Sequence, residues 1–200
     1  MTPLLPLAFF ARDTVSVARD LIGARLRRGP VTLEITEVEA YPPGDSAAHT
    51  RHGRTARNAP MWGPPGRAYV FLCYGLHQML NVVTGAEGEG AAVLVRACRP
   101  VAGVDVVQTR RGCALGPKLL DGPGKVGQAL ALDASFNHHL LYRRGGLELR
   151  AGLGPAPLLT GPRVGIDYAT AEHRAAPWRF ALADCPWVSH RKALTPLSPE

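Results

Sequence analysis

The stretch AYVFLCYGLHQMLNVVTGAEGEGAAVLVRA, residues 68–97, decides the fold. It holds three apolar runs of strand length, Ala68 to Tyr74, Leu76 to Val83 and Ala91 to Ala97, which are rich in valine, leucine and aromatic residues. Only short connections separate these runs. Strands that follow each other directly favour an antiparallel or mixed sheet over repeated strand–helix–strand units.

The segments upstream add a helix and a hairpin. Thr14 to Leu21 carries apolar residues at helical spacing, and Asp13 or Thr14 can cap it. Arg25 to Arg28 and Val31 to Val38 flank Gly29-Pro30, which is typical of a hairpin turn.

The segments downstream are less regular. Pro123 to Leu132 is typical of a helix. Weaker strand patterns occur at Leu147 to Arg150, Arg163 to Tyr168 and Trp178 to Leu182. Strands outnumber helices, so the sequence predicts an α+β fold, with residues 1–200 in a single domain around an antiparallel or mixed sheet flanked by helices.

The composition is that of a folded protein with a basic surface. The chain has 200 residues, of which 46% are apolar, enough to bury a core. The formal net charge of +7 favours a polyanionic partner such as nucleic acid or an anionic membrane. A basic soluble protein without such a partner would have the same composition. No apolar run approaches the length of a membrane span and the N-terminus has no positively charged leader, so we expect a cytoplasmic protein without membrane association.

The cysteines and histidines give no metal motif. Cys73, Cys98, Cys113 and Cys185 lie far apart, which predicts isolated, buried thiols in a reducing compartment. His49 and His52 have a spacing found in some metal sites, but no third ligand follows at motif spacing. We therefore expect no metal.

The segment from Tyr41 to Gly66 is rich in Pro, Gly, Arg and His and has little periodicity. Long irregular segments inside a compact domain are usually functional or disordered. Within it, Arg51, Arg54 and Arg57 can contact a phosphate backbone, although a solvated basic loop would have the same sequence.

Two carboxylates at the end of a predicted strand are candidates for general-base chemistry. If the alternation of Leu33 and Ile35 continues, Glu37 and Glu39 point toward the apolar face, where the pKa of a carboxylate can be tuned. The alternative is that they pair with nearby arginines. Arg96 interrupts the apolar run AAVLVRAC and needs a partner such as Glu39, unless it reaches water at the strand end.

Aromatic residues cluster around one strand: Trp62, Tyr69, Phe71 and Tyr74. Core packing explains most clusters of this kind. Tyr74 differs because it precedes Gly75, and an aromatic residue beside a glycine can project from a tight turn. Next to a basic loop, such a residue is a candidate for stacking or insertion between bases.

Separated motifs along the chain together resemble one protein family. These motifs are, in order, ITEVEAY, AAHTRHGRTARNAPMWGPPGRAYVFLCYGLHQMLNVV, AAVLVRA, GPGKVGQAL, PRVGID and PWVS. From about Thr14 to Ser189, the chain resembles the alkyladenine (3-methyladenine) DNA glycosylases of the animal and bacterial type. The resemblance implies a single-domain α+β fold with a curved antiparallel sheet, outside the helix–hairpin–helix class, that needs no metal or other cofactor.

The resemblance assigns catalytic roles to three positions. Glu39 matches the glutamate that activates the attacking water. Arg96 matches the arginine that holds this water and the glutamate, and Val164 matches a residue whose backbone helps to bind the water.

It also assigns roles toward the substrate. Tyr41 and His49 match residues that stack on the flipped base and contact its edge. Tyr74 matches the tyrosine that fills the gap left in the duplex, and Asn81 matches an asparagine that obstructs the amino group of guanine. Phe71 belongs to the same base-binding set but stands where well-known members have a tyrosine, so it keeps the stacking ring and lacks the hydroxyl group.

Two loops differ in length from the family. The connection between Tyr41 and His49 is shorter, and the segment of residues 85–90 is longer. The implied function is a monofunctional glycosylase of base excision repair that binds double-stranded DNA containing damaged purines, acts as a monomer and does not cleave the strand. A DNA-lesion binding protein without chemistry is the alternative, which loss of the carboxylate at position 39 would mark. A nucleic-acid metalloenzyme would need clustered ligands that the sequence lacks.

Overall fold

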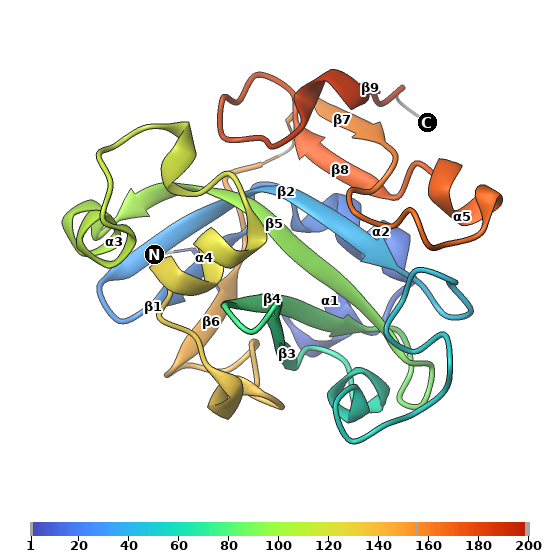
Figure 1. The fold of residues 1–200 in the computed structure, drawn as a ribbon. Helices are drawn as coiled ribbons and strands as arrows, with labels where there is room; N and C mark the ends of the chain where they lie inside the picture. Colours follow the sequence, from blue (N-terminus) through green and yellow to red (C-terminus); the bar gives the residue numbers. More distant parts are fainter. Residues whose placement is uncertain (1, 155, 199–200) are drawn as a thin grey trace.

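The sheet is built around two long central strands, β2 (Val31–Tyr41) and β5 (Ala91–Ala102). The computed structural model describes residues 2–154 and 156–198. Within these ranges nine strands form one sheet, with the order β3-β4-β5-β2-β8-β7-β9 and with β1 paired to both β2 and β6 (Figure 1). The other strands are β1 (Arg25–Arg28), β3 (Ala68–Cys73), β4 (His77–Thr84), β6 (Leu147–Arg150), β7 (Leu158–Gly161), β8 (Arg179–Leu182) and β9 (Thr195–Pro196).

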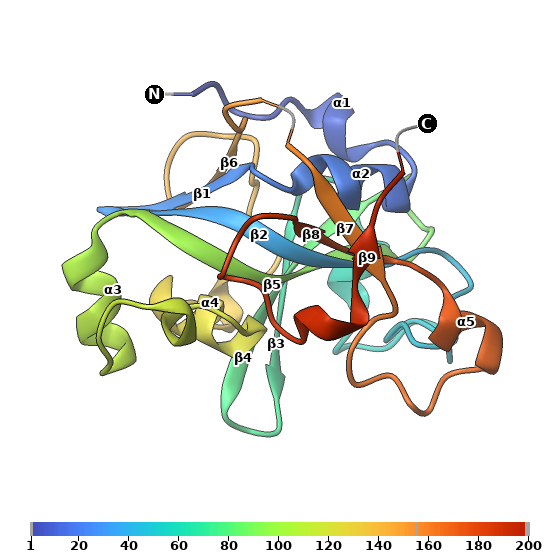
Figure 2. The ribbon, with the colours of Figure 1, turned by 90° about the horizontal axis from the view of Figure 1, so that it is seen from above.

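Every strand pairing in the described ranges is antiparallel, so the sheet is antiparallel rather than mixed. It is also bent. Figure 2 shows the hairpin of β3 and β4 running steeply away from the direction of β2 and β5. The hairpin tip therefore projects from the body of the molecule.

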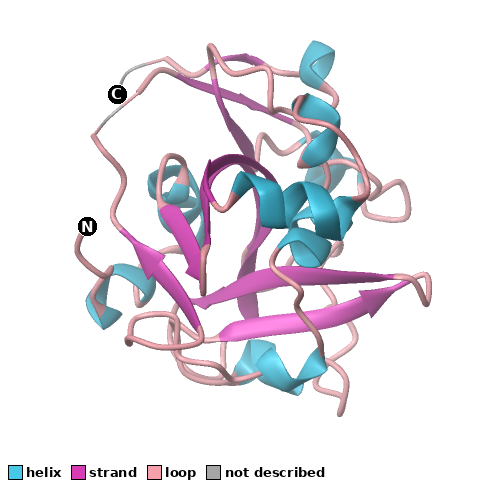
Figure 3. Ribbon diagram, turned by 90° about the vertical axis from the view of Figure 1, so that its left-hand side faces the viewer, coloured by secondary structure: helices cyan, strands magenta, loops and turns pink. Residues whose placement is uncertain are grey.

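Helices flank the sheet on both sides (Figures 2 and 3). The helices α1 (Leu7–Phe10) and α2 (Thr14–Leu21) lie on one side, and α3 (Val104–Arg111) and α4 (Pro123–Ala129) lie on the other; α5 (Ala171–Ala175) lies beyond the end of β2. The side chain of Asp13 caps α2 by accepting a hydrogen bond from the backbone N–H of Ser16. None of the helices in the described ranges is long and apolar enough to cross a membrane.

The α+β architecture agrees with the sequence prediction, and most predicted elements are present. The helix at residues 14–21 and the strands at 25–28 and 147–150 have the predicted bounds. The predicted strand from Arg163 to Tyr168 is wrong. Gly165 there has a positive φ of 75°, and the Ala169 N–H donates to the carbonyl of Ile166, which makes the segment a series of turns.

The predicted orientation of the two glutamates in β2 is also wrong. Val38 and Ala40 pack in the main core as Leu33 and Ile35 do, which places Glu37 and Glu39 outside that apolar set. The register between β2 and β5 shifts on both sides of Glu37. Such bulges insert extra residues into a strand and so reverse the inward and outward alternation.

The prediction of four buried thiols holds only in part. Cys98 and Cys185 are buried, whereas Cys73 and Cys113 are partly exposed. Both exceptions lie at the ends of elements, Cys73 at the last position of β3 and Cys113 just after α3, where packing is incomplete.

Candidate active site

One row of residues crosses five strands and supports the candidate site. The strand register aligns Tyr69 with Asn81, Asn81 with Leu94, Leu94 with Glu39, and Glu39 with Arg179. Residues directly opposite each other in neighbouring strands point to the same face of a sheet. The row therefore places an aromatic ring, an amide and a carboxylate side by side on one face.

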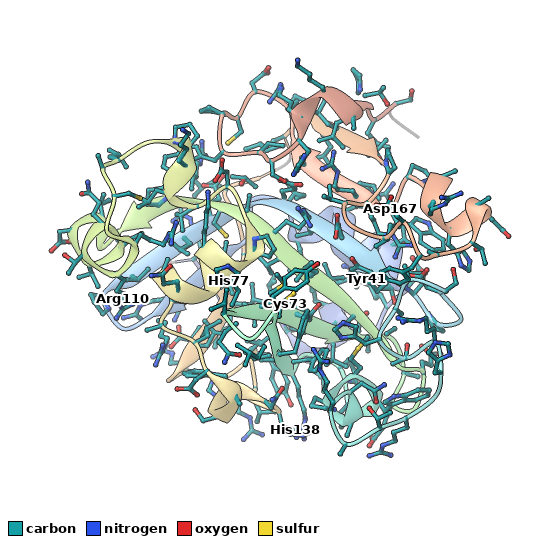
Figure 4. The ribbon with its side chains drawn as sticks, viewed as in Figure 1. Tyr41, Cys73, His77, Arg110, His138 and Asp167 are labelled. Carbon is teal, nitrogen blue, oxygen red and sulfur yellow. The ribbon has the colours of Figure 1, made fainter. Side chains whose placement is uncertain are left out.

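A pocket lies above this row. Its empty volume, including the open mouth, is about 340 Å³. It is lined by Tyr41, Ala47, His49, Met61, Tyr69, Phe71, Asn81, Leu94 and Tyr168. All four residues that the sequence analysis assigned to base binding are among them. In Figure 4, Tyr41 lies where β2 ends, beside the loop that carries Asp167.

The pocket has flat aromatic walls. The rings of Tyr69 and Phe71 are stacked with their centroids 5.6 Å apart. The His49 ring meets Phe71 edge to face at 4.4 Å, and its Nδ1 lies 3.0 Å from the Tyr69 hydroxyl. Burial raises the pKa of Tyr69 to about 12, so this hydroxyl keeps its proton at neutral pH. Flat, largely apolar walls with a few polar groups suit a planar heterocycle.

Glu39 is fully buried beside the pocket and is held by two hydrogen-bond donors and one ion pair. Its Oε1 accepts a hydrogen bond from the backbone N–H of Val164 at 2.7 Å, and its Oε2 accepts one from the Tyr41 hydroxyl at 2.9 Å. The guanidinium of Arg96 lies 3.3 Å from Oε2. The structure thus brings together the three positions to which the resemblance assigned catalytic roles.

Glu37 forms a second buried charge cluster behind Glu39. Its Oε1 pairs with Arg96 at 3.1 Å and with Arg179 at 3.3 Å. It also accepts hydrogen bonds from the backbone N–H and hydroxyl of Ser189 at 2.6 and 2.9 Å. Both carboxylate oxygens of Glu37 therefore have partners, as the arginine-pairing alternative of the sequence analysis expected. Glu37 also holds Arg96 in place.

Burial and the charge of Glu39 shift the pKa values of its neighbours Tyr41 and Arg96. Burial first, and then the charge of Glu39, raises the pKa of Tyr41 well above its ordinary value, so Tyr41 stays a hydrogen-bond donor. Burial disfavours the Arg96 cation, but Glu39 and Glu37 outweigh it and raise the pKa of Arg96. Arg96 accordingly has the buried partners that the sequence analysis required, rather than reaching water.

The hairpin tip presents Tyr74 to solvent. Tyr74 and Gly75 both have positive φ, at 51° and 69°, in the turn between β3 and β4. Two successive residues with positive φ are typical of tight hairpin turns. The Tyr74 side chain is 91% exposed, so it takes no part in core packing.

The three arginines of the basic loop differ in their surroundings. The Arg51 guanidinium lies 4.7 Å from the ring centre of Tyr168, and Arg57 donates a hydrogen bond to the carbonyl of Leu72 at 3.1 Å. Within the described ranges, Arg54 is exposed and has no hydrogen bond or ion pair. All three lie on the same exposed loop as His52.

Sequence reasoning missed two parts of the site. Tyr168 closes one side of the pocket and donates a hydrogen bond to the carbonyl of Ala47 at 2.8 Å. Arg163 forms a buried ion pair with Asp45 next to Tyr41. The motif PRVGID contains both Arg163 and Val164. Because the sequence analysis assigned this segment to a strand, it did not predict that Arg163 would contact Asp45 and Tyr41. No group of three or more His, Cys, Asp or Glu residues in the described part of the chain is arranged to hold a metal ion.

Comparisons with known proteins agree with this geometry. The model of the methylpurine-DNA glycosylase family, MPG, matches residues 8–186. A protein of Nitrosococcus oceani, provisionally named 3-methyladenine DNA glycosylase, is 62% identical over 98% of this chain and 98% of its own length. The DNA-3-methyladenine glycosylase of Arabidopsis thaliana is 56% identical over 97% of this chain and 78% of its own length.

These matches, with the fold and the pocket, define the chain as a DNA glycosylase, a class of hydrolases that bind DNA and act in its repair. Within this class the chain belongs to the methylpurine-DNA glycosylase family.

Proposed function

We propose that this glycosylase flips alkylated or deaminated purines out of duplex DNA and hydrolyses their bond to deoxyribose with a water that Glu39 activates. The observation that carries the proposal is the buried Glu39 carboxylate, held by Tyr41, Arg96 and the Val164 N–H at the edge of an aromatic pocket. A fixed, ionisable group beside a pocket for a planar ring is what base hydrolysis requires.

The reaction needs one proton acceptor and stabilisation of positive charge. As the bond between the base nitrogen and C1′ breaks, its electron pair leaves with the purine and positive charge builds on the sugar. The Glu39 carboxylate stabilises this charge and takes a proton from the water whose oxygen bonds to C1′. A purine alkylated at N3 or N7 is cationic and leaves as a neutral base, so little acid catalysis is needed for it. A deaminated purine leaves as an anion and takes up one proton, which balances the proton that Glu39 removes from the water.

The lining of the pocket supports a role in binding the flipped base. Tyr41 and Phe71 offer ring faces, and His49 reaches the edge of the base. Asn81 donates a hydrogen bond to the carbonyl of Tyr69, which orients its amide in the pocket. This supports the role that the resemblance implies for Asn81, obstruction of the amino group of guanine. Flipping costs least for a damaged, weakly paired base, which adds to selectivity.

The same site supports a monofunctional enzyme. Strand cleavage by a glycosylase requires an amine that forms a Schiff base with the sugar, and the residues described as lining the pocket include no lysine. We therefore propose base release without strand cleavage, by a monomer, on DNA in the cytoplasm.

Replacement of Glu39 by glutamine tests the proposal. Glu39→Gln keeps the shape of the side chain but cannot accept a proton, so lesion binding should persist while single-turnover base release falls by about 10²–10⁴-fold. Gel shift and release of a methylated purine measure the two properties. Glu34→Gln is the matched control, because Glu34 lies on the same strand and pairs with Arg99 away from the pocket.

If Glu39→Gln released the purine within about threefold of the wild-type rate, another residue would have to be the general base. A threefold loss is small against the effect expected of general-base catalysis. Lesion binding by the wild type without any release on a panel of alkylated and deaminated purines would favour the non-catalytic lesion-binding protein instead.

A further inference from the structure

The guanidinium of Arg163 is enclosed between two aromatic rings. It lies 4.7 Å from the ring centre of Tyr41 and 5.0 Å from that of Trp178. Its NH1 and NH2 groups donate to both carboxylate oxygens of Asp45, with 3.0 Å for the NH2 contact. They also donate to the carbonyls of Ala40 at 2.9 Å and His173 at 3.1 Å. The guanidinium is thus fixed in position and in plane.

Stability alone does not account for this arrangement. The side chains of Arg163 and Asp45 are both 0% exposed, so both charges are removed from water. Burial of an ion pair costs desolvation energy, and well-packed apolar residues of similar volume often give equal or greater stability. A buried arginine against an aromatic face at this site therefore calls for a second role.

Tyr41 connects the arginine to the chemistry. Arg163 covers one face of the Tyr41 ring and does not line the pocket, whereas Tyr41 does. The Tyr41 hydroxyl donates to Glu39. The orientation of one ring therefore determines both the surface offered to a base and a donor to the carboxylate.

We propose that Arg163, fixed by Asp45, is a positioning residue that holds the Tyr41 ring flat against the pocket and its hydroxyl on Glu39. This inference rests on the proposed function. Arginine suits the task because its planar fork can stack on a ring and bind a carboxylate at two points, which lysine cannot do.

A double-mutant cycle tests the proposal. The paired change Asp45→Asn with Arg163→Met removes both charges, so that neither is left buried alone. With Tyr41 present, the pair should lower single-turnover release by about tenfold, because small misplacements at an active site have effects of this order or larger. In a Tyr41→Ala background, the same pair should lower release by less than about twofold, since the ring through which Arg163 acts is gone. An equal loss in both backgrounds would overturn the proposal and leave Arg163 a structural residue.

Two further measurements keep the outcomes separate. Arg163→Lys retains the pairing with Asp45 and should fold even if the paired variant does not; it should show the same dependence on Tyr41 with a smaller loss. Affinity for a methylpurine duplex, measured throughout in proteins that carry Glu39→Gln, repeats the cycle without catalysis. If the effects on affinity are non-additive but the wild type releases no purine, the proposed function is overturned and the positioning of Tyr41 by Arg163 is supported. Release by the wild type with additive binding would sink the inference alone.

Discussion

At the scale of single residues, His49 is adapted to stay neutral in the pocket. Burial lowers its pKa below the ordinary value of 6.5, and the nearby cations of Arg57 and Arg51 lower it further. The folded protein therefore binds a proton at His49 less readily than the unfolded chain does. This residue's contribution to stability is complete above the ordinary value and is lost as the pH falls below it toward the lowered pKa.

Removal of one of the two nearby cations should change the pKa of His49 measurably. In Arg57→Ala, the pKa of His49 should rise toward 6.5, because the larger of the two charge effects on it is absent. The NMR shifts of the imidazole protons, followed against pH, measure the change. Arg54→Ala is the control, because the charge of Arg54 is not among the causes of the shift. A rise of the same size in both variants would show that the effect is not local.

At the scale of elements, the β3–β4 hairpin carries its tyrosine outside the core. Because the Tyr74 ring is exposed, Tyr74→Ala should leave thermal stability near that of the wild type, whereas a buried aromatic would cost about 3–5 kcal/mol. If the ring fills the gap in the stack, the flipped complex should weaken by about 1–3 kcal/mol. Melting temperature and the fluorescence of 2-aminopurine beside the lesion report the two effects.

Leu76→Ala provides the comparison for that hairpin, because Leu76 is 77% exposed at the same tip and lacks an aromatic ring. Equal loss of flipping in both variants would assign the effect to exposed apolar area. A large drop in melting temperature for Tyr74→Ala with unchanged flipping would remove the insertion role.

Elements with a clear local pattern could be predicted from the sequence, and those set by distant partners could not. Apolar periodicity placed α2 and the strands at residues 68–97. The bulge at Glu37 left no local signal in the sequence, and the partners of the Glu37 side chain, Arg96 and Ser189, are far away along the chain. The same holds for the site. Motifs grouped Glu39 with Arg96, whereas the contact of Arg163 with Tyr41 arises only from the folded path of the chain.

At the scale of the whole molecule, the net charge of +7 predicts binding that weakens steeply with salt. An alanine triple variant of Arg51, Arg54 and Arg57 should flatten the plot of log K against log salt concentration, by roughly 0.9 for each phosphate that the loop no longer neutralises. The structure refines this expectation. Arg54→Ala should account for most of the change, because the guanidinium groups of Arg51 and Arg57 already contact Tyr168 and Leu72.

Fluorescence anisotropy over a range of salt concentrations measures these slopes. Arg144→Ala is a suitable control, since Arg144 lies beside Arg27 and Arg150, away from the residues that line the base pocket. An unchanged slope in the triple variant would show that this loop faces away from DNA.

The row from Tyr69 through Asn81, Leu94 and Glu39 to Arg179 has a consequence for how this protein can vary in evolution. Each of the five strands contributes one residue to the row, so the alignment depends on the register between strands and not on the spacing of the residues along the chain. Residues inserted into or deleted from a connecting loop, as in the longer segment at positions 85–90, leave every member of the row in place. A single residue inserted in β4 just before Asn81, or in β5 just before Leu94, would turn that side chain to the opposite face and remove it from the row. Insertions and deletions should therefore be tolerated between these strands and purged within them.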